Sequence, residues 1–252
     1  MPRRLQSLLL LLCMAMPPLM LPDMHHAAQA ATLAEKGLAA YAASMEYYYR
    51  KPQPQLLSTL LQRMDEARLL ADGEKRLMVA AFLGECLRAD PSLRRMIAAA
   101  LAHAGEENGH NIRRTLAWAA HLAGLRDAPA LVRQLLPNRA DLTLRDHILS
   151  TPSPLLRWKA TSESSILHMY WTAFMASGNT AYVEAVIAAA CRYARLAAGG
   201  RQYEDDFDLC RQAAASLYEF TPRHELVRCC VEKALAATQD PAEKRTLRLM
   251  LR

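Results

Sequence analysis

Beyond its first thirty residues, the chain has no stretch in which apolar and polar residues alternate as they do in a β-strand. Alanine, leucine and arginine dominate, and β-branched residues are sparse. Apolar residues recur at helical spacing, as in the series Leu56, Leu60 and Met64. The sequence therefore predicts an all-α fold of about ten helices.

Short turn signals separate the expected helices. Thr32 and Glu35 form a capping box, which predicts a first helix running to about Tyr49. A second helix covers the apolar positions from Leu56 to Met64 and is expected to end at Asp72-Gly73. Later joints combine caps, glycines and prolines: Asp90-Pro91, Gly124 with Asp127, Gly178-Asn179-Thr180, Thr221-Pro222 and Asp240-Pro241. Because these connections are short, neighbouring helices are expected to pack as antiparallel hairpins.

Residues 1–30 have the layout of a secretory signal peptide. Arg3-Arg4 precedes an apolar run from Leu8 to Met16, and Ala28-Gln29-Ala30 offers the small residues after which a signal peptidase cleaves. The run is too short for a membrane-spanning helix, which takes roughly 20 residues, and no later uncharged segment approaches that length. We expect an exported protein, periplasmic or secreted, with an all-helical domain over 31–252 and no transmembrane segment after signal cleavage.

One predicted hairpin has a distinctive composition. From Trp171 to Ala190 the chain holds an aromatic-rich helix, a Gly178-Asn179 turn and an alanine-rich helix, and Trp118 to Leu136 repeats this more loosely. The pattern resembles a tetratricopeptide hairpin, although the period of about 34 residues is not kept. The chain is also similar to uncharacterised exported all-helical bacterial proteins. The resemblance implies an irregular helical-repeat array, whose concave surface would bind a protein or peptide.

Residues 137–154 interrupt the helical pattern. The stretch holds three prolines and no sustained periodicity. It is expected either to join two helical halves, 31–136 and 155–252, or to lie as a loop over one continuous core. A structureless connection of this length is uncommon in a compact domain and is often functional.

Known metal-binding and catalytic motifs are incomplete in this chain. His224-Glu225 begins like the helix of zinc proteases, but Arg228 stands where the second histidine ligand is needed. Glu107 and His110 form half of a di-iron motif, and no second Glu-x-x-His pair exists in the sequence. The acidic run from Glu204 to Asp208 lacks the central glycine and terminal glutamate of a calcium loop. We therefore expect no metal and no cofactor.

Three consecutive tyrosines, Tyr47, Tyr48 and Tyr49, are candidate binding residues together with Arg50. On a helix the three would span about 200° of the circumference, so one neighbour cannot bury them all. At least one is expected to be exposed beside Arg50 and Lys51, which suits a binding surface.

The cysteine spacing predicts a disulfide. Five cysteines remain after signal cleavage, and export permits oxidation. Cys191 and Cys210 lie symmetrically about the bond between Gly200 and Arg201, and Cys210 and Cys229 lie on either side of the Thr221-Pro222 joint. If the chain bends into a hairpin between the two cysteines of a pair, their sulfurs lie opposite each other on the two antiparallel helices. Because both pairs include Cys210, Cys191–Cys210 and Cys210–Cys229 are alternative bridges. The competing interpretation is that the cysteines are small buried hydrophobic residues.

The net charge and the predicted export together limit the classes of function that we expect. The net charge of +6 would raise the question of nucleic acid in a cytosolic protein, but an exported chain is not expected to meet nucleic acid. The leading hypothesis is a non-enzymatic scaffold of the bacterial cell envelope that binds a protein or peptide. The alternative is a cell-envelope hydrolase with paired carboxylates, such as Glu106 or Glu107, in a helical cleft. Two facing carboxylates in a pocket would favour the hydrolase, and a shallow groove lined by tyrosine and arginine would favour the scaffold.

Overall fold

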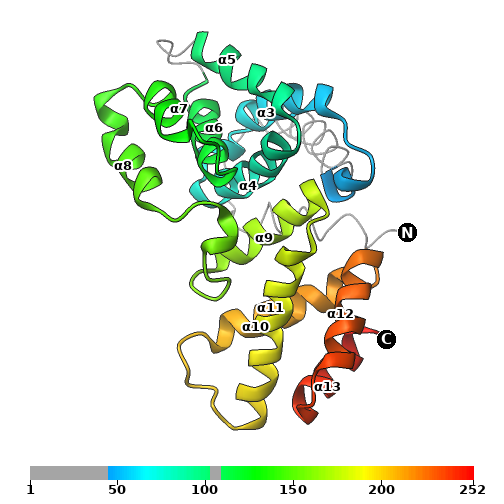
Figure 1. The fold of residues 1–252 in the computed structure, drawn as a ribbon. Helices are drawn as coiled ribbons and strands as arrows, with labels where there is room; N and C mark the ends of the chain where they lie inside the picture. Colours follow the sequence, from blue (N-terminus) through cyan, green and yellow to red (C-terminus); the bar gives the residue numbers. More distant parts are fainter. Residues whose placement is uncertain (1–44, 103–108) are drawn as a thin grey trace, which may run out of the picture.

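The structure, a computed structural model, describes residues 45–102 and 109–252. Within these ranges every regular element is helical, which confirms the all-α prediction (Figure 1). The predicted signal peptide and the predicted capping box at Thr32 and Glu35 lie outside the described residues. The α-helices are α3 Leu57–Glu66, α4 Gly73–Ala89, α5 Arg94–Ala102, α6 His110–Leu122, α7 Ala128–Leu135, α8 Leu142–Ser150, α9 Ser164–Ser177, α10 Thr180–Ala198, α11 Phe207–Phe220, α12 Glu225–Ala237 and α13 Pro241–Met250. Short 3-10 helices are η2 Tyr48–Arg50, η3 Pro54–Leu56, η4 Leu69–Ala71, η5 Pro91–Leu93, η6 Arg139–Asp141 and η7 Leu155–Arg157.

Helix α4 lies at the centre of the fold. It packs against α6 and against α9 (Figure 1), and each of its residues from Met78 to Leu87 is buried. A helix that is apolar around most of its circumference has to be enclosed by others. Gly84 permits a close approach to α6, because a Cβ atom there would lie 3.1 Å from the carbonyl oxygen of Ala119 and 3.3 Å from the amide nitrogen of Ala123.

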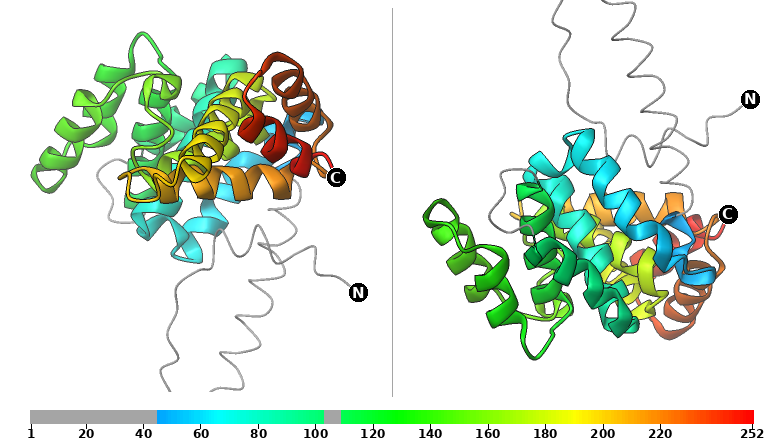
Figure 2. Two further views of the ribbon diagram at one scale, coloured as in Figure 1. Left: turned by 90° about the horizontal axis from the view of Figure 1, so that it is seen from below. Right: turned by 90° about the horizontal axis from the view of Figure 1, so that it is seen from above.

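The C-terminal helices are arranged around α10, which packs against α9, α11, α12 and α13. Gly178 ends α9 in a left-handed conformation with φ of 66°, and the Asn179 side chain accepts a hydrogen bond from the Ala181 N–H at 3.1 Å. Helices α9 and α10 therefore form the hairpin predicted at this turn. Helices α8 and α13 lie at opposite ends of the molecule (Figure 2).

Two predicted cap-plus-proline joints form as expected. The carboxylates of Asp90 and Asp240 each accept a hydrogen bond from the backbone N–H two residues further on, at 2.9 Å and 2.7 Å. In both cases proline follows in the first turn, where its missing N–H removes no helical hydrogen bond. Because these contacts join residues that are close in sequence, they determine where η5 and α13 begin.

Two predicted boundaries are wrong, and one predicted side-chain cap does not form. Asp72-Gly73 begins α4 instead of ending the helix before it, because the Asp72 carboxylate accepts hydrogen bonds from two backbone N–H groups of the first turn of α4. Asp127 stands directly before α7, as predicted, but its side chain makes no capping hydrogen bond and instead forms an ion pair with Arg94 at 3.1 Å. Thr221-Pro222 does not start a helix, since α12 begins only at Glu225.

The prediction that residues 137–154 form a structureless connection is also wrong. They contain helix α8, which the flanking prolines delimit. The buried Asp141 pairs with Arg114 of α6 at 2.7 Å, and Ile148 is completely buried. Buried residues on both sides of this segment belong to one hydrophobic cluster that reaches from Tyr48 to Met250.

Gly84→Ala tests the close approach of α4 to α6. The added methyl group would meet backbone atoms, and overpacking of a core costs about 1–3 kcal/mol. Since alanine is favoured over glycine in a helix by about 1 kcal/mol, we expect a net loss of about 1 kcal/mol in the free energy of unfolding, measured by urea denaturation. Gly73→Ala is the control, because its nearest neighbour would be the Arg76 guanidinium at 3.7 Å. Equal stability of the two variants would contradict the close approach.

Candidate functional site

The predicted binding residues, Tyr47 to Arg50, lie in a turn and in η2 instead of at the end of an α-helix. Their side chains therefore reach different neighbours. Tyr48 is buried with its ring edge against Phe82 of α4, at a centroid distance of 5.1 Å. Tyr49 is half-buried and packs against Phe174 of α9 at 5.3 Å.

Four side chains gather around His224, and together with it they form what we call the His224 cluster: Glu46, Tyr47, Tyr49, Arg223 and His224. Tyr47 stacks on the imidazole with centroids 4.7 Å apart, and its hydroxyl donates to the Arg223 carbonyl oxygen at 3.1 Å. Arg223 Nη2 lies 2.6 Å from Glu46 Oε1, and His224 Nε2 lies 3.4 Å from the same oxygen. The Tyr49 hydroxyl lies 3.4 Å from His224 Nδ1. The cluster joins the first described residues to the connection between α11 and α12.

The His224 cluster holds the fold together and is closed to substrates. His224 is 0% exposed, so no molecule outside the protein reaches its imidazole. Burial opposes the ionisation of Glu46, but His224 and Arg223 outweigh burial and hold the pKa of this carboxyl below its usual value. At neutral pH Glu46 is therefore a carboxylate that bridges Arg223 and His224.

Arg50 is the exposed member of the predicted binding residues. Its guanidinium lies over the rings of Tyr47 and Tyr49, 5.3 Å and 5.7 Å from their centroids, and its Nε donates to the Tyr49 hydroxyl at 3.1 Å. These contacts are intramolecular. The structure brings three of the four residues together, and their role in binding a partner stays a prediction.

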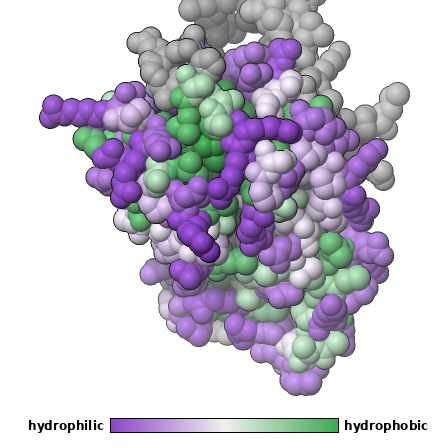
Figure 3. Space-filling view, turned by 45° about the horizontal axis from the view of Figure 1, so that its top comes forward, coloured by the Kyte–Doolittle hydropathy of each residue, from purple (hydrophilic) through white to green (hydrophobic). Residues whose placement is uncertain are grey.

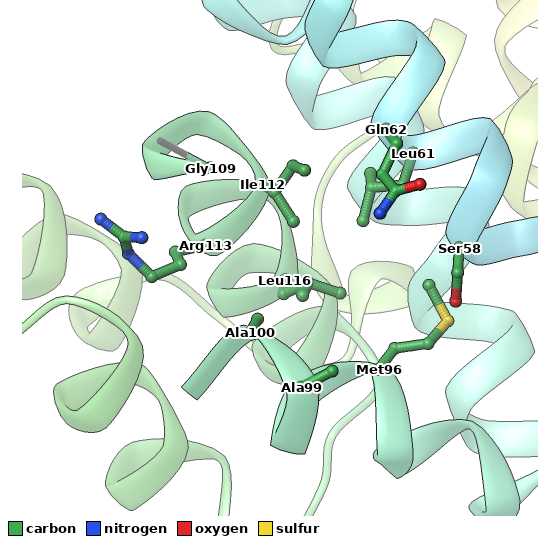
Figure 4. Close-up of a pocket in the computed structure, with 10 residues that line it drawn as sticks. All are labelled: Ser58, Leu61, Gln62, Met96, Ala99, Ala100, Gly109, Ile112, Arg113 and Leu116. Carbon is green, nitrogen blue, oxygen red and sulfur yellow. The ribbon is translucent and has the colours of Figure 1, made fainter. Parts of the chain in front are cut away.

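An apolar pocket of about 400 Å³ opens between α3, α5 and α6. Leu61, Ile112 and Leu116 point toward one another, whereas the Arg113 guanidinium points away from them (Figure 4). Apolar side chains gather on the side of the molecule that these helices form (Figure 3). The pocket is lined by Ser58, Leu61, Gln62, Met96, Ala99, Ala100, Gly109, Ile112, Arg113 and Leu116.

A second hollow, which we call the α10 groove, lies over α10 between α11 and α13. It has a volume of about 370 Å³, and its lining is Tyr193, Ala194, Ala197, Ala198, Ala214, Tyr218, Ala242, Arg245, Thr246, Leu249 and Met250. Two large apolar side chains of this lining are unusually exposed, Tyr218 at 64% and Leu249 at 50%. Exposed apolar side chains that gather in one place are typical of interaction sites.

The sequence interpretation missed the α10 groove. Its alanines are good helix formers anywhere and carry no sign of a site. The structure shows that Tyr218 and Leu249 are not among the buried residues of α11 and α13. A single such residue on a helix is ordinary, so only the folded chain shows that the two share one groove.

The cysteines of the described residues are all free thiols in the structure. Cys191 lies near Glu243 of α13, whereas Cys210 lies near Asp206. Burial raises the pKa of the Cys191 thiol to about 11 and raises the pKa of Cys210 as well, so neither is an activated nucleophile. The bridges Cys191–Cys210 and Cys210–Cys229 stay predictions, which mass spectrometry of the unreduced protein can decide.

Several of the described side chains of the incomplete motifs are engaged in ion pairs. His110 Nε2 lies 3.4 Å from Asp141 Oδ1. Asp206 pairs with Arg192 at 2.8 Å, and Asp208 pairs with an arginine one turn further on. Over the residues that the structure describes, no group of three or more His, Cys, Asp or Glu side chains converges as metal ligands would.

Comparison with family models, with curated proteins and with solved structures finds no match to this chain. No helix within 45–102 or 109–252 combines the length and the apolar character that crossing a membrane requires.

Glu46→Gln removes the charge of the His224 cluster and keeps its shape. We expect the free energy of unfolding at pH 7 to fall by about 1–3 kcal/mol, because Arg223 loses its buried ion-pair partner and His224 loses the carboxylate beside it. Folding lowers the pKa of Glu46 below 4.5, so the carboxylate contributes fully above that value and its contribution is lost as the pH falls through the folded pKa. Urea denaturation from pH 5 to pH 3 is expected to show the gap between the two proteins closing.

Glu66→Gln is the matched control for this pH series. Glu66 pairs with Arg63 at 3.0 Å on the exposed surface of α3. Exposed pairs contribute little, so this variant is expected to stay within about 0.5 kcal/mol of the wild type at every pH. A Glu46→Gln gap of the same size at pH 3 and at pH 5 would mean that Glu46 does not act as a paired carboxylate.

Proposed function

We propose that this protein is a non-enzymatic scaffold of the bacterial cell envelope that binds a protein or peptide partner in the α10 groove. The observation that carries the proposal is the groove itself, an open surface with an alanine floor bordered by Tyr193, Tyr218 and Arg245. Tyrosine and arginine are enriched among the residues that contribute most to protein–protein affinity. Apolar side chains at the centre of such a surface supply the area that a partner covers.

The composition of both hollows supports binding over hydrolysis. A hydrolase that uses paired carboxylates needs two acids that face each other across the substrate. The lining of neither the α10 groove nor the apolar pocket includes an Asp or Glu of the described chain. Glu106 and Glu107, the acids considered for hydrolysis, lie outside the described residues. No feature of the described structure favours the hydrolase.

The proposal also includes that the protein is exported and that its helices form a repeat-like array. Export is supported by the signal layout of residues 1–30, and the architecture by the hairpin of α9 and α10. An exported scaffold meets its partner in the periplasm or outside the cell. There its basic surface faces proteins and envelope components instead of nucleic acid.

Site-specific photo-crosslinking tests whether the α10 groove contacts a partner. A photoreactive phenylalanine analogue replaces Tyr218 in the full chain, which is expressed in the cells that produce it and then irradiated. We expect one discrete crosslinked species, identified by mass spectrometry. The control places the same analogue at Tyr203, which is 80% exposed and lies outside the groove lining. Absence of a product at Tyr218, or the same product at Tyr203, would count against the proposal.

Tyr218→Ala tests how much the groove contributes to affinity. Tyrosines that become buried at the centre of an interface contribute about 2 kcal/mol or more, so affinity for the crosslinked partner is expected to fall roughly thirtyfold by calorimetry. Because Tyr218 is 64% exposed in the free protein, the unfolding temperature of the Tyr218→Ala variant is expected to equal that of the wild type. Tyr203→Ala, the matched control, is expected to leave both affinity and unfolding unchanged. Unaltered affinity of Tyr218→Ala would remove the groove from the interface.

A further inference from the structure

We infer that the partner in the α10 groove is an α-helix that carries carboxylates along one flank of its apolar stripe. This inference rests on the proposed function and specifies the chemistry of the partner. Three features of the groove support it: its shape, its lack of free backbone groups and the distribution of charge along its two walls.

The groove floor lets a helix approach closely. Ala194, Ala197 and Ala198 recur three and four positions apart, so this part of α10 presents methyl groups to the groove, with Tyr193 beside them. Helices α11 and α13 pack along α10 and form the two walls. Because the distance between packed helices shrinks with the side chains between them, a partner helix can lie on these alanines. Its apolar stripe would then pack between Tyr218 and Leu249.

The backbone of the groove favours a helical partner over an extended one. The three helices that form the groove use their backbone N–H and C=O groups internally. An extended peptide placed there would lose water from its own backbone groups and find few replacements, which is costly. A helix satisfies its own backbone, so it can cover an apolar floor of this kind without that cost.

Uncompensated positive charge lies on one wall only. Arg245 belongs to the groove lining, and Arg248 follows one turn later on the exposed side of α13. Neither arginine has an ion-pair partner among the residues that the structure describes. On the α11 wall, by contrast, Arg211 is paired with Asp208 at 2.9 Å. Carboxylates on the α13 side of a partner would complement this charge and set the direction in which the helix lies.

Three fluorescent peptides test the inference by anisotropy with the full chain. The first two share a leucine and alanine stripe at helical spacing and carry either glutamate or lysine along one flank of it. The third is the glutamate peptide with a central proline, which breaks the helix. We expect the glutamate peptide to bind about tenfold or more tightly than the other two, with an affinity that decreases as salt is added.

Charge reversal on α13 is the decisive variant. The double change Arg245→Glu and Arg248→Glu is expected to abolish the preference for the glutamate peptide. Arg126→Glu with Arg139→Glu is the control, because both arginines are exposed outside the groove lining and the net charge changes equally. This control is expected to retain the preference. Both double variants change exposed residues, so folding is checked by their unfolding temperatures.

The outcomes separate this inference from the proposed function. Equal binding of the glutamate and lysine peptides, or full binding of the proline peptide, would overturn the inference while the crosslink at Tyr218 still supported a scaffold. Loss of that crosslink as well would remove both. Two other occupants would also overturn it: a second copy, seen as a dimer by sedimentation that Tyr218→Ala disrupts, or a membrane surface, seen as binding to phosphatidylglycerol vesicles that the α13 charge reversal abolishes.

Discussion

The enclosure of helix α4 is the constraint on which the other elements depend. Its buried stretch includes Glu85, and a carboxylate in such a place is costly unless it is paired. The Tyr182 hydroxyl donates to one oxygen of Glu85 at 2.6 Å, and Arg88 pairs with the other oxygen. Because Tyr182 belongs to α10, the hydrogen bond that satisfies α4 also positions α10. This bond is made near the start of α10, whereas the α10 groove lies over the other end of the same helix, from Tyr193 to Ala198.

The His224 cluster secures the other side of the same arrangement. Tyr49 rests on the turn between α9 and α10, where a Cβ atom at Gly178 would come within 3.0 Å of its ring. The same tyrosine reaches His224 in the connection between α11 and α12. Tyr49 thus contacts two connections between C-terminal helices. The ion pair of Glu46 and Arg223 also attaches the chain segment before Tyr49 to the connection between α11 and α12. The tyrosines singled out in the sequence are in this way part of the support of the fold.

Signals that act within a few residues could be read from the sequence, and those that need the folded chain could not. Asp90 and Asp240 cap helices through neighbouring backbone groups, so these joints and the all-α class were predictable. Helix α8 was missed because its short pattern lies between prolines and depends on the pairing of Asp141 with α6. The contact between Tyr49 and His224 joins residues 175 positions apart, and no local rule links them.

The small residues of α10 explain why a groove exists at all. Larger side chains at Ala197 and Ala198 would pack against Tyr218 and Leu249 and close the surface between α11 and α13. With alanine there, Tyr218 and Leu249 remain exposed to water. Burial of apolar surface contributes about 25 cal/mol of favourable free energy per Å², and this contribution is missing in the free protein. A partner that covers them recovers this free energy, whatever its charge. Arg245 contributes a charge, so its main effect is to select which partner is accepted and in which orientation.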